Sequence, residues 1–172
     1  MSLSGDRTGT DRSKIRGSKE QGLDDTDLRI LALLQREGRL SNAKLAERLN
    51  LSETPCWRRL KRLETEGYID GYQARLNRQK LGMGVVGFAQ VTFGDHSGQA
   101  PLEFEQKMAQ IPEILSCHNV SGDCDYILQI VAKDLESYGD FVRDQLRVLP
   151  GITAIRSSLA LREVKTGYRL PV

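Results

Sequence analysis

The sequence contains little cysteine, with only three cysteines and one tryptophan among 172 residues. Cys56, Cys117 and Cys124 show no paired spacing, which argues against a disulfide framework and against a zinc site. We expect all three to pack as small apolar residues, Cys56 in a helix core, Cys117 in a strand and Cys124 at the start of a strand. No metal and no cofactor is therefore expected.

Long apolar runs and a signal sequence are also missing. No stretch is long enough to span a bilayer, and the N-terminus lacks the apolar core of a signal peptide. These absences predict a cytoplasmic protein that has no membrane partner. Residues 1–22 are rich in Ser, Gly, Thr, Lys and Arg, and we predict a disordered arm there, either native or an added extension.

The chain has no large excess of charge of either sign, because 25 basic and 23 acidic residues leave a formal net charge of +2. Residues 1–22 carry 5 basic and 3 acidic residues, residues 23–76 carry 10 and 9, and residues 77–172 carry 10 and 11. The protein is therefore no general polycation, and any basic surface must come from local clustering. The length allows one large domain or two small ones.

Motifs of the common hydrolases and nucleotide-binding enzymes are absent: the sequence has no GxSxG, no phosphate loop and no HExxH. An enzyme would have to use Asp123 and Asp125 as a carboxylate pair, with His96 or His118 as a base. His96 falls in a polar loop, and a structural role is the usual one for a strand histidine such as His118. We therefore expect a protein that is not an enzyme.

The clearest positive signal lies in residues 41–72, SNAKLAERLNLSETPCWRRLKRLETEGYIDGY. Ser41 is a predicted N-cap for a helix over 42–49, whose inward face is Ala43, Leu45, Ala46 and Leu49. After a tight linker, Ser52 fits the N-cap of a second helix that Gly67 can close. Two short helices joined by a turn are typical of a helix-turn-helix.

The segments on either side complete a small domain. Residues 23–37 predict a helix with an acidic first turn and an inward face of Leu28, Leu31, Ala32 and Leu34. A wing-like strand is predicted from Tyr68, Ile69, Tyr72 and Leu76. We therefore predict a winged helix-turn-helix domain over residues 23–76.

The helix that begins after Ser52 has two different sides. At about 100° per residue, Cys56, Leu60 and Leu63 share the side that should face the core. Thr54, Arg58, Lys61 and Arg62 lie on the far side, and Trp57 and Arg59 lie on the flanks. Trp57 could touch a sugar-phosphate backbone or cover the edge of the core, and packing is the favoured role.

Four basic residues in five positions suit contacts with phosphates and guanine edges. A charge run alone would favour an ordinary solvated face, but the adjoining helix and wing favour a helix that lies in the major groove of double-stranded DNA. The predicted DNA-binding residues are Ser52, Thr54, Trp57, Arg58, Arg59, Lys61 and Arg62.

The second half of the chain follows a hinge over 77–84 and forms a second predicted domain over 85–172. In chain order we predict a strand (85–93), a helix (101–110), two strands (114–120 and 125–131), a helix (134–149) and a strand (152–161). This βαββαβ order is a ferredoxin-like arrangement, so the whole chain is α+β. One face of such a sheet has no helix over it and must be covered. A second copy of the chain is the simplest cover, which predicts a homodimer.

The turn in VSGDCDY is the candidate for a small-molecule site. Gly122 lets the backbone approach a ligand or take a positive φ, and Asp123 and Asp125 could hold an ammonium group. The alternative is a hairpin turn whose acidic residues bind backbone donors. The residues alone favour that alternative.

The run from Leu23 to Asn77 resembles the DNA-binding half of the Lrp/AsnC, or feast/famine, transcriptional regulators. The Leu-Asp opening, LSETPC, RLE-x-x-G-x-I and GY-x-A-x-LN carry this resemblance. It continues through SGDCDYILQIVAKD, LPGI and REVK, and therefore covers the chain from Leu23 to its C-terminus. Each motif is weak alone, but their order and spacing together are specific.

The resemblance implies a regulator with an N-terminal winged helix-turn-helix and a C-terminal ferredoxin-like domain of the RAM type. It implies a homodimer that assembles further to an octamer, with a small amino-acid effector bound between dimers. Carried over position by position, it gives as effector-binding residues Gly122, Asp123, Asp125, Leu135, Ser158, Leu159 and Ala160. A nucleoid-type architectural protein without an effector is the alternative, against which the focused basic charge argues.

Overall fold

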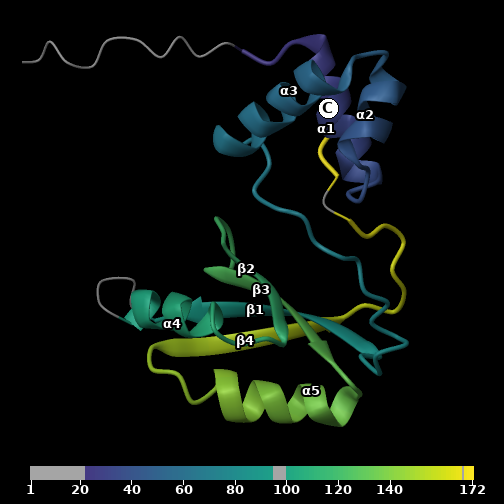
Figure 1. The fold of residues 1–172 in the computed structure, drawn as a ribbon. Helices are drawn as coiled ribbons and strands as arrows, with labels where there is room; N and C mark the ends of the chain where they lie inside the picture. The colour runs from purple at the N-terminus through teal and green to yellow at the C-terminus, as the bar shows by residue number, and fades with distance from the viewer. Residues whose placement is uncertain (1–21, 95–99, 168) are drawn as a thin grey trace, which may run out of the picture. The chain divides into compact units, whose positions relative to one another are not determined.

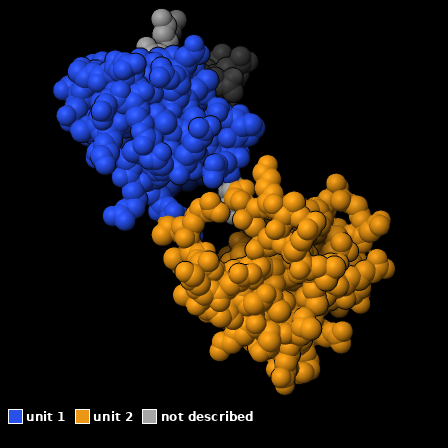
Figure 2. All heavy atoms as spheres, turned by 90° about the vertical axis from the view of Figure 1, so that its right-hand side faces the viewer, with its two compact units in different colours: residues 1–73, 169–172 blue, residues 74–168 orange. Residues whose placement is uncertain are grey.

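The computed structural model describes residues 22–94, 100–167 and 169–172. It forms two compact units, shown in Figures 1 and 2: the chain up to Gln73 together with Arg169–Val172, and Ala74–Tyr168. The predicted arm, except Gly22, lies outside the described residues, as does His96. The C-terminal residues belong with the first unit, where the Gln35 side chain accepts a hydrogen bond from the Leu170 N–H at 2.6 Å and donates one to its carbonyl at 3.2 Å.

The first unit contains three helices, α1 (Asp25–Arg36), α2 (Asn42–Leu49) and α3 (Glu53–Thr65). Asp24 caps α1 in a reciprocal capping box with Asp27, and the Ser41 hydroxyl accepts a hydrogen bond from the Lys44 N–H at 3.3 Å at the start of α2. The three helices enclose a core that consists of Ile30, Leu34, Leu45, Ala46, Leu49, Cys56 and Leu63. The predicted trihelical domain is therefore confirmed, and so is the core position of Cys56.

Three details of this domain differ from the prediction. Ala43 is exposed, because at 100° per residue it lies more than 90° away from the centre of the stripe formed by Leu45, Ala46 and Leu49. In α1 the buried residues are Asp27, Ile30 and Leu34, while the other predicted inward residues are only half-buried. The segment 68–76 forms no strand, so the predicted wing-like strand is wrong.

The second unit is an antiparallel four-stranded sheet with the order β2-β3-β1-β4. Its strands are β1 (Val85–Phe93), β2 (Ile114–Asn119), β3 (Tyr126–Ala132) and β4 (Ile152–Leu159), and its helices are α4 (Ala100–Met108), α5 (Leu135–Phe141) and the π-helical turn η1 (Val142–Leu146). This order and topology confirm the ferredoxin-like fold. The second predicted helix ends at Leu146 and not at Leu149, because the chain turns before Pro150 and Gly151 lead into β4.

Both helices pack against the same face of the sheet. Alternate residues of β1, namely Ala89, Val91 and Phe93, form one core with residues of α4, β3, α5 and η1, among them Phe104, Leu128, Ile130, Tyr138 and Leu146. Tyr138 fits there because Gly87 of β1 has no side chain: a Cβ on Gly87 would lie 2.2 Å from its ring. The strand predicted over residues 85–93 is therefore confirmed, and its alternate residues face the core.

The opposite face of the sheet carries a mixture of apolar and polar side chains. Phe88 is paired with Gln129 and with Ser158, and Gln90 with Ile127. These residues are intermediate or exposed, and Phe88 is 39% exposed. No helix among the described residues packs on this face.

Candidate DNA-binding and effector sites

The start of α3 is fixed by the turn that joins it to α2. Asn50 takes a left-handed conformation (φ 54°), and the Leu51 N–H donates to the Ala46 carbonyl at 2.9 Å. The Asn42 side-chain amide donates to the Glu53 carbonyl at 3.0 Å and so ties the first turn of α2 to the first turn of α3. At the other end, Gly67 has a φ of +76° and follows the C-cap Glu66. Both ends of α3 are therefore anchored by backbone contacts.

One side of α3 is open to solvent. It presents Thr54, Trp57, Arg58 and Lys61, all exposed. Lys61 lies 3.5 Å from the Glu64 carboxylate in a surface contact, whereas Arg58 has no ion pair within the described part of the chain. Ser52 occupies the N-cap position, as predicted, but its side chain makes no capping hydrogen bond. Trp57 is 56% exposed, so its predicted packing against the core is wrong.

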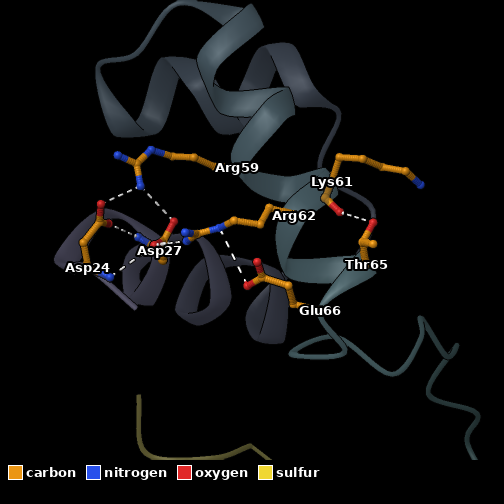
Figure 3. A network of polar contacts seen from close by, with 7 residues as sticks. All are labelled: Asp24, Asp27, Arg59, Lys61, Arg62, Thr65 and Glu66. Carbon is orange, nitrogen blue, oxygen red and sulfur yellow. Dashed lines mark hydrogen bonds and ion pairs between the residues drawn. The ribbon is translucent and has the colours of Figure 1, made fainter. Parts of the chain in front are cut away.

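Arg59 and Arg62 point the other way, toward α1 (Figure 3). Arg59 Nη1 donates to Asp24 Oδ2 at 2.6 Å and to Asp27 Oδ1 at 2.9 Å. Arg62 Nη2 donates to the other oxygen of Asp27. The prediction that Arg62 lies on the far side with Arg58 and Lys61 is therefore wrong, because the Asp27 carboxylate draws its guanidinium onto the flank that faces α1.

In this contact between α1 and α3, the charges of the carboxylates and the guanidinium groups stabilise each other. The Asp27 N–H and the Arg59 guanidinium stabilise the charged form of Asp24, so the pKa of this carboxyl lies below its ordinary value. The two carboxylates in turn raise the pKa of the Arg59 guanidinium. We name these four residues, Asp24, Asp27, Arg59 and Arg62, the Asp/Arg cluster.

Asp27 is the residue that sequence reasoning missed. It is fully buried, and no other charged residue is buried in the described parts of the chain. A signal for it was present, since Asp27 occupies the same helical stripe as Ile30 and Leu34. A charged residue on an apolar stripe needs a partner of opposite charge, and the basic helix downstream supplies two.

Only part of the predicted effector turn is exposed and available to a ligand. Gly122 has a φ of +125° and is exposed, as is Asp123. Asp125 is hydrogen-bonded to β1. Its carboxylate accepts a hydrogen bond from the Phe93 N–H at 2.7 Å, and its own N–H donates to the Val91 carbonyl at 2.9 Å.

The remaining predicted effector residues lie at the other end of the sheet. Leu159 is paired with Gly87, next to Ser158 on β4, and the Ala160 N–H donates to the Val86 carbonyl at 2.9 Å. Leu135, the first residue of α5, is 62% exposed. The turn adjoins Val91, so the two groups are separated by about four residues of β1, or roughly 14 Å. One chain therefore does not bring the seven predicted residues together.

Two cavities of the second unit are not lined by these residues either. A cavity of about 470 Å³ lies between α4 and β2, lined by residues that include Glu105, Cys117 and Tyr126. A second, of about 530 Å³, is lined by residues that include Ile111 and Phe141. Within the described ranges there is no cluster of His, Cys, Asp or Glu suited to a metal ion, and no helix there has the length and apolarity needed to cross a membrane.

Comparison with known proteins agrees with this architecture. A winged helix-turn-helix DNA-binding model matches residues 23–70, and the Lrp/AsnC ligand binding domain matches residues 86–170. The Bkd operon transcriptional regulator of Pseudomonas aeruginosa is 41% identical over 83% of this chain and 93% of its own length. The leucine-responsive regulatory protein of Escherichia coli is 38% identical over 93% of this chain and 96% of its own.

A solved structure gives the same result at the level of the fold. The complex of a Neisseria meningitidis transcriptional regulator with L-methionine superposes with a TM-score of 0.84, is 38% identical, and covers 87% of this chain and 97% of that one. Both halves of the sequence, their order and their folds thus match one group of proteins. The chain belongs to the Lrp/AsnC family of transcriptional regulators.

Proposed function

We propose that α3 reads DNA through its exposed side. In this proposal the major groove receives the side chains of Thr54, Trp57, Arg58 and Lys61, and Ser52 lies beside the sugar-phosphate backbone of the DNA. The observation that carries this proposal is the division of the helix. Arg58 and Lys61 face solvent, while Arg59 and Arg62 are bound to carboxylates. An exposed arginine at the centre of an anchored helix suits a guanine edge or a phosphate. The protein works in the cytoplasm as a binding protein and not as an enzyme.

Selection of duplexes from a random pool, followed by competition, tests this function. A sequence-reading protein enriches one motif and binds it on the order of 10³ times or more tightly than random duplexes at physiological salt. A nucleoid-type architectural protein would bind selected and random duplexes about equally. That second outcome would contradict sequence-specific regulation, whatever the total affinity.

We further propose that the sheet face without helices is the surface on which two copies of the chain associate. Its side chains, Phe88 and Ile127 among Gln90 and Gln129, mix apolar and polar groups as protein interfaces do. Sedimentation at micromolar concentration should show a dimer or a larger assembly such as an octamer. A stable monomer under these conditions would exclude this association.

The effector site, in this proposal, forms between chains. The turn at Gly122–Asp123 and the segment Ser158–Ala160 lie at opposite ends of one sheet, so a site that uses both must take them from different subunits. The relative from Neisseria meningitidis was solved with L-methionine, and the relative from Escherichia coli is named for its response to leucine. We therefore propose an amino acid as the effector. Gly122 would offer its backbone to the carboxylate, and Asp123 would bind the ammonium group.

A thermal-shift screen of the twenty amino acids should reveal this effector, because a ligand that binds only the folded protein raises its stability. The shift should be lost in Asp123→Asn, which removes the charge that pairs with the ammonium group. Glu103→Gln is the matched control, since it neutralises an exposed carboxylate on α4 in the same unit. If no amino acid stabilises the parent protein, or if both variants respond like it, Asp123 is not an effector ligand.

A further inference from the structure

The Asp/Arg cluster lies on the flank of α3 that faces α1, whereas Lys61 of the proposed reading side points away from it (Figure 3). Arg59 of the cluster directly follows Arg58 of the reading side in the sequence. The cluster joins two guanidinium groups to two carboxylates, so the four side chains together carry no net charge. Arg59 and Arg62 remain partly open, with 34% and 25% of their side chains exposed. Two long basic side chains are thus held on the proposed reading helix without contributing a free positive charge to it.

We propose that Asp24 and Asp27 are specificity-determining residues, which hold Arg59 and Arg62 away from DNA phosphates. This inference rests on the proposed reading role of α3. Contacts with phosphates add affinity for any sequence, whereas contacts with base edges discriminate between sequences. Two more free arginines on α3 would therefore strengthen binding to random DNA more than to a chosen site. The cluster leaves the discriminating contacts to the exposed side of the helix.

The geometry at Asp24 distinguishes this role from simple structural support. Asp24 Oδ1 accepts the capping hydrogen bond from the Asp27 N–H at 2.9 Å, and Oδ2 accepts the bond from Arg59 at 2.6 Å. Asparagine caps helices as well as aspartate does, so the cap alone does not need a charged residue. The side chain is also 51% exposed, and exposed ion pairs add little stability. What the carboxylate adds at this position is one of the two negative charges that balance Arg59 and Arg62; without it, both guanidinium groups share the single carboxylate of Asp27.

Asp24→Asn tests the proposal without removing the cap. The probes are a random-sequence duplex pool and a duplex that the parent protein selects from it, both titrated across a range of salt concentrations. We expect tighter binding to the random pool, a more negative dependence of log K on log salt, by up to about 0.9 per protomer, and a smaller ratio of selected to random affinity. Arg59→Gln in the Asp24→Asn background should abolish these changes, because it removes the positive charge that Asp24→Asn leaves unbalanced beside Asp27.

Asp25→Asn is the matched control. Asp25 is the next residue along α1, it is exposed, and no contact with an arginine is present among the described residues. The Asp25→Asn substitution changes the net charge by the same amount as Asp24→Asn but leaves both contacts of Arg59 in place. Equal salt dependence in Asp24→Asn and Asp25→Asn would overturn the proposal, as would a steeper dependence that persists after Arg59→Gln.

Failure of the inference can be told apart from failure of the proposed function. If the parent protein shows no preference for its selected duplex, the proposal that α3 reads DNA sequence is wrong, and the role of the Asp/Arg cluster falls with it. If the parent discriminates and Asp24→Asn discriminates equally well, only the role of the Asp/Arg cluster is wrong. Thermal unfolding of each variant is measured before the DNA titrations, so that every comparison is made on folded protein.

Discussion

Arg58→Ala is expected to weaken binding to a selected duplex by about 1–3 kcal/mol, or roughly five- to 160-fold. Arg58 is exposed near the middle of α3 and, within the described residues, has no carboxylate partner. Its removal breaks no contact in the folded protein, so the free energy of unfolding should change by no more than about 0.5 kcal/mol. Titration of labelled duplexes, together with denaturant unfolding of the same samples, measures both quantities.

The form of the loss identifies the contact that Arg58 makes. A lost base contact should relax the preference at one position of the selected motif, whereas a lost phosphate contact should reduce the salt slope by about 1 for all sequences. Arg29→Ala is a suitable control, since Arg29 is exposed on α1 of the same unit. If the two variants bind the selected duplex equally well, the reading side of α3 has been assigned wrongly.

The fold was predictable because local patterns and tertiary contacts agree throughout most of the chain. The 42–49 helix, its Ser41 cap and the strand over 85–93 have the bounds expected from sequence. Alternate residues of β1 form the inner face of the sheet, as the two-residue period of a strand requires. The segment 68–76 was not predictable in this way: Tyr68, Ile69 and Tyr72 have strand propensity, but no described strand pairs with them.

The functional surfaces were less predictable, because they depend on contacts between distant residues. Arg58 and Arg59 are neighbours in the sequence, yet among the described residues only Arg59 has acidic partners, which lie 32 and 35 residues earlier. A helical wheel gives the direction of a Cβ but not the path of a long arginine side chain. The predicted effector residues show the same limit, since within one chain they lie at two ends of the sheet.

Asp27→Asn is expected to reduce the free energy of unfolding of the first unit by about 3 kcal/mol. Asp27 is fully buried and binds both arginines of the cluster. Removal of one partner from a buried ion pair costs about 3–5 kcal/mol, and the lower value applies because Arg59 and Arg62 are partly exposed. Arg62 Nε lies 4.0 Å from the Glu66 carboxylate and makes no hydrogen bond, so among the described residues Asp27 is the one hydrogen-bond partner of this guanidinium.

The single tryptophan makes this measurement specific to one unit. Trp57 lies on α3, so its fluorescence reports the unfolding of the helical domain, while far-ultraviolet circular dichroism also follows the sheet. Asp27→Asn should shift the fluorescence transition to lower denaturant and leave the transition of the second unit unchanged. Asp25→Asn, with the same change of charge on the same helix turn, should unfold like the parent. A fluorescence midpoint for Asp27→Asn equal to that of Asp25→Asn would mean that the buried carboxylate does not hold α3 against α1.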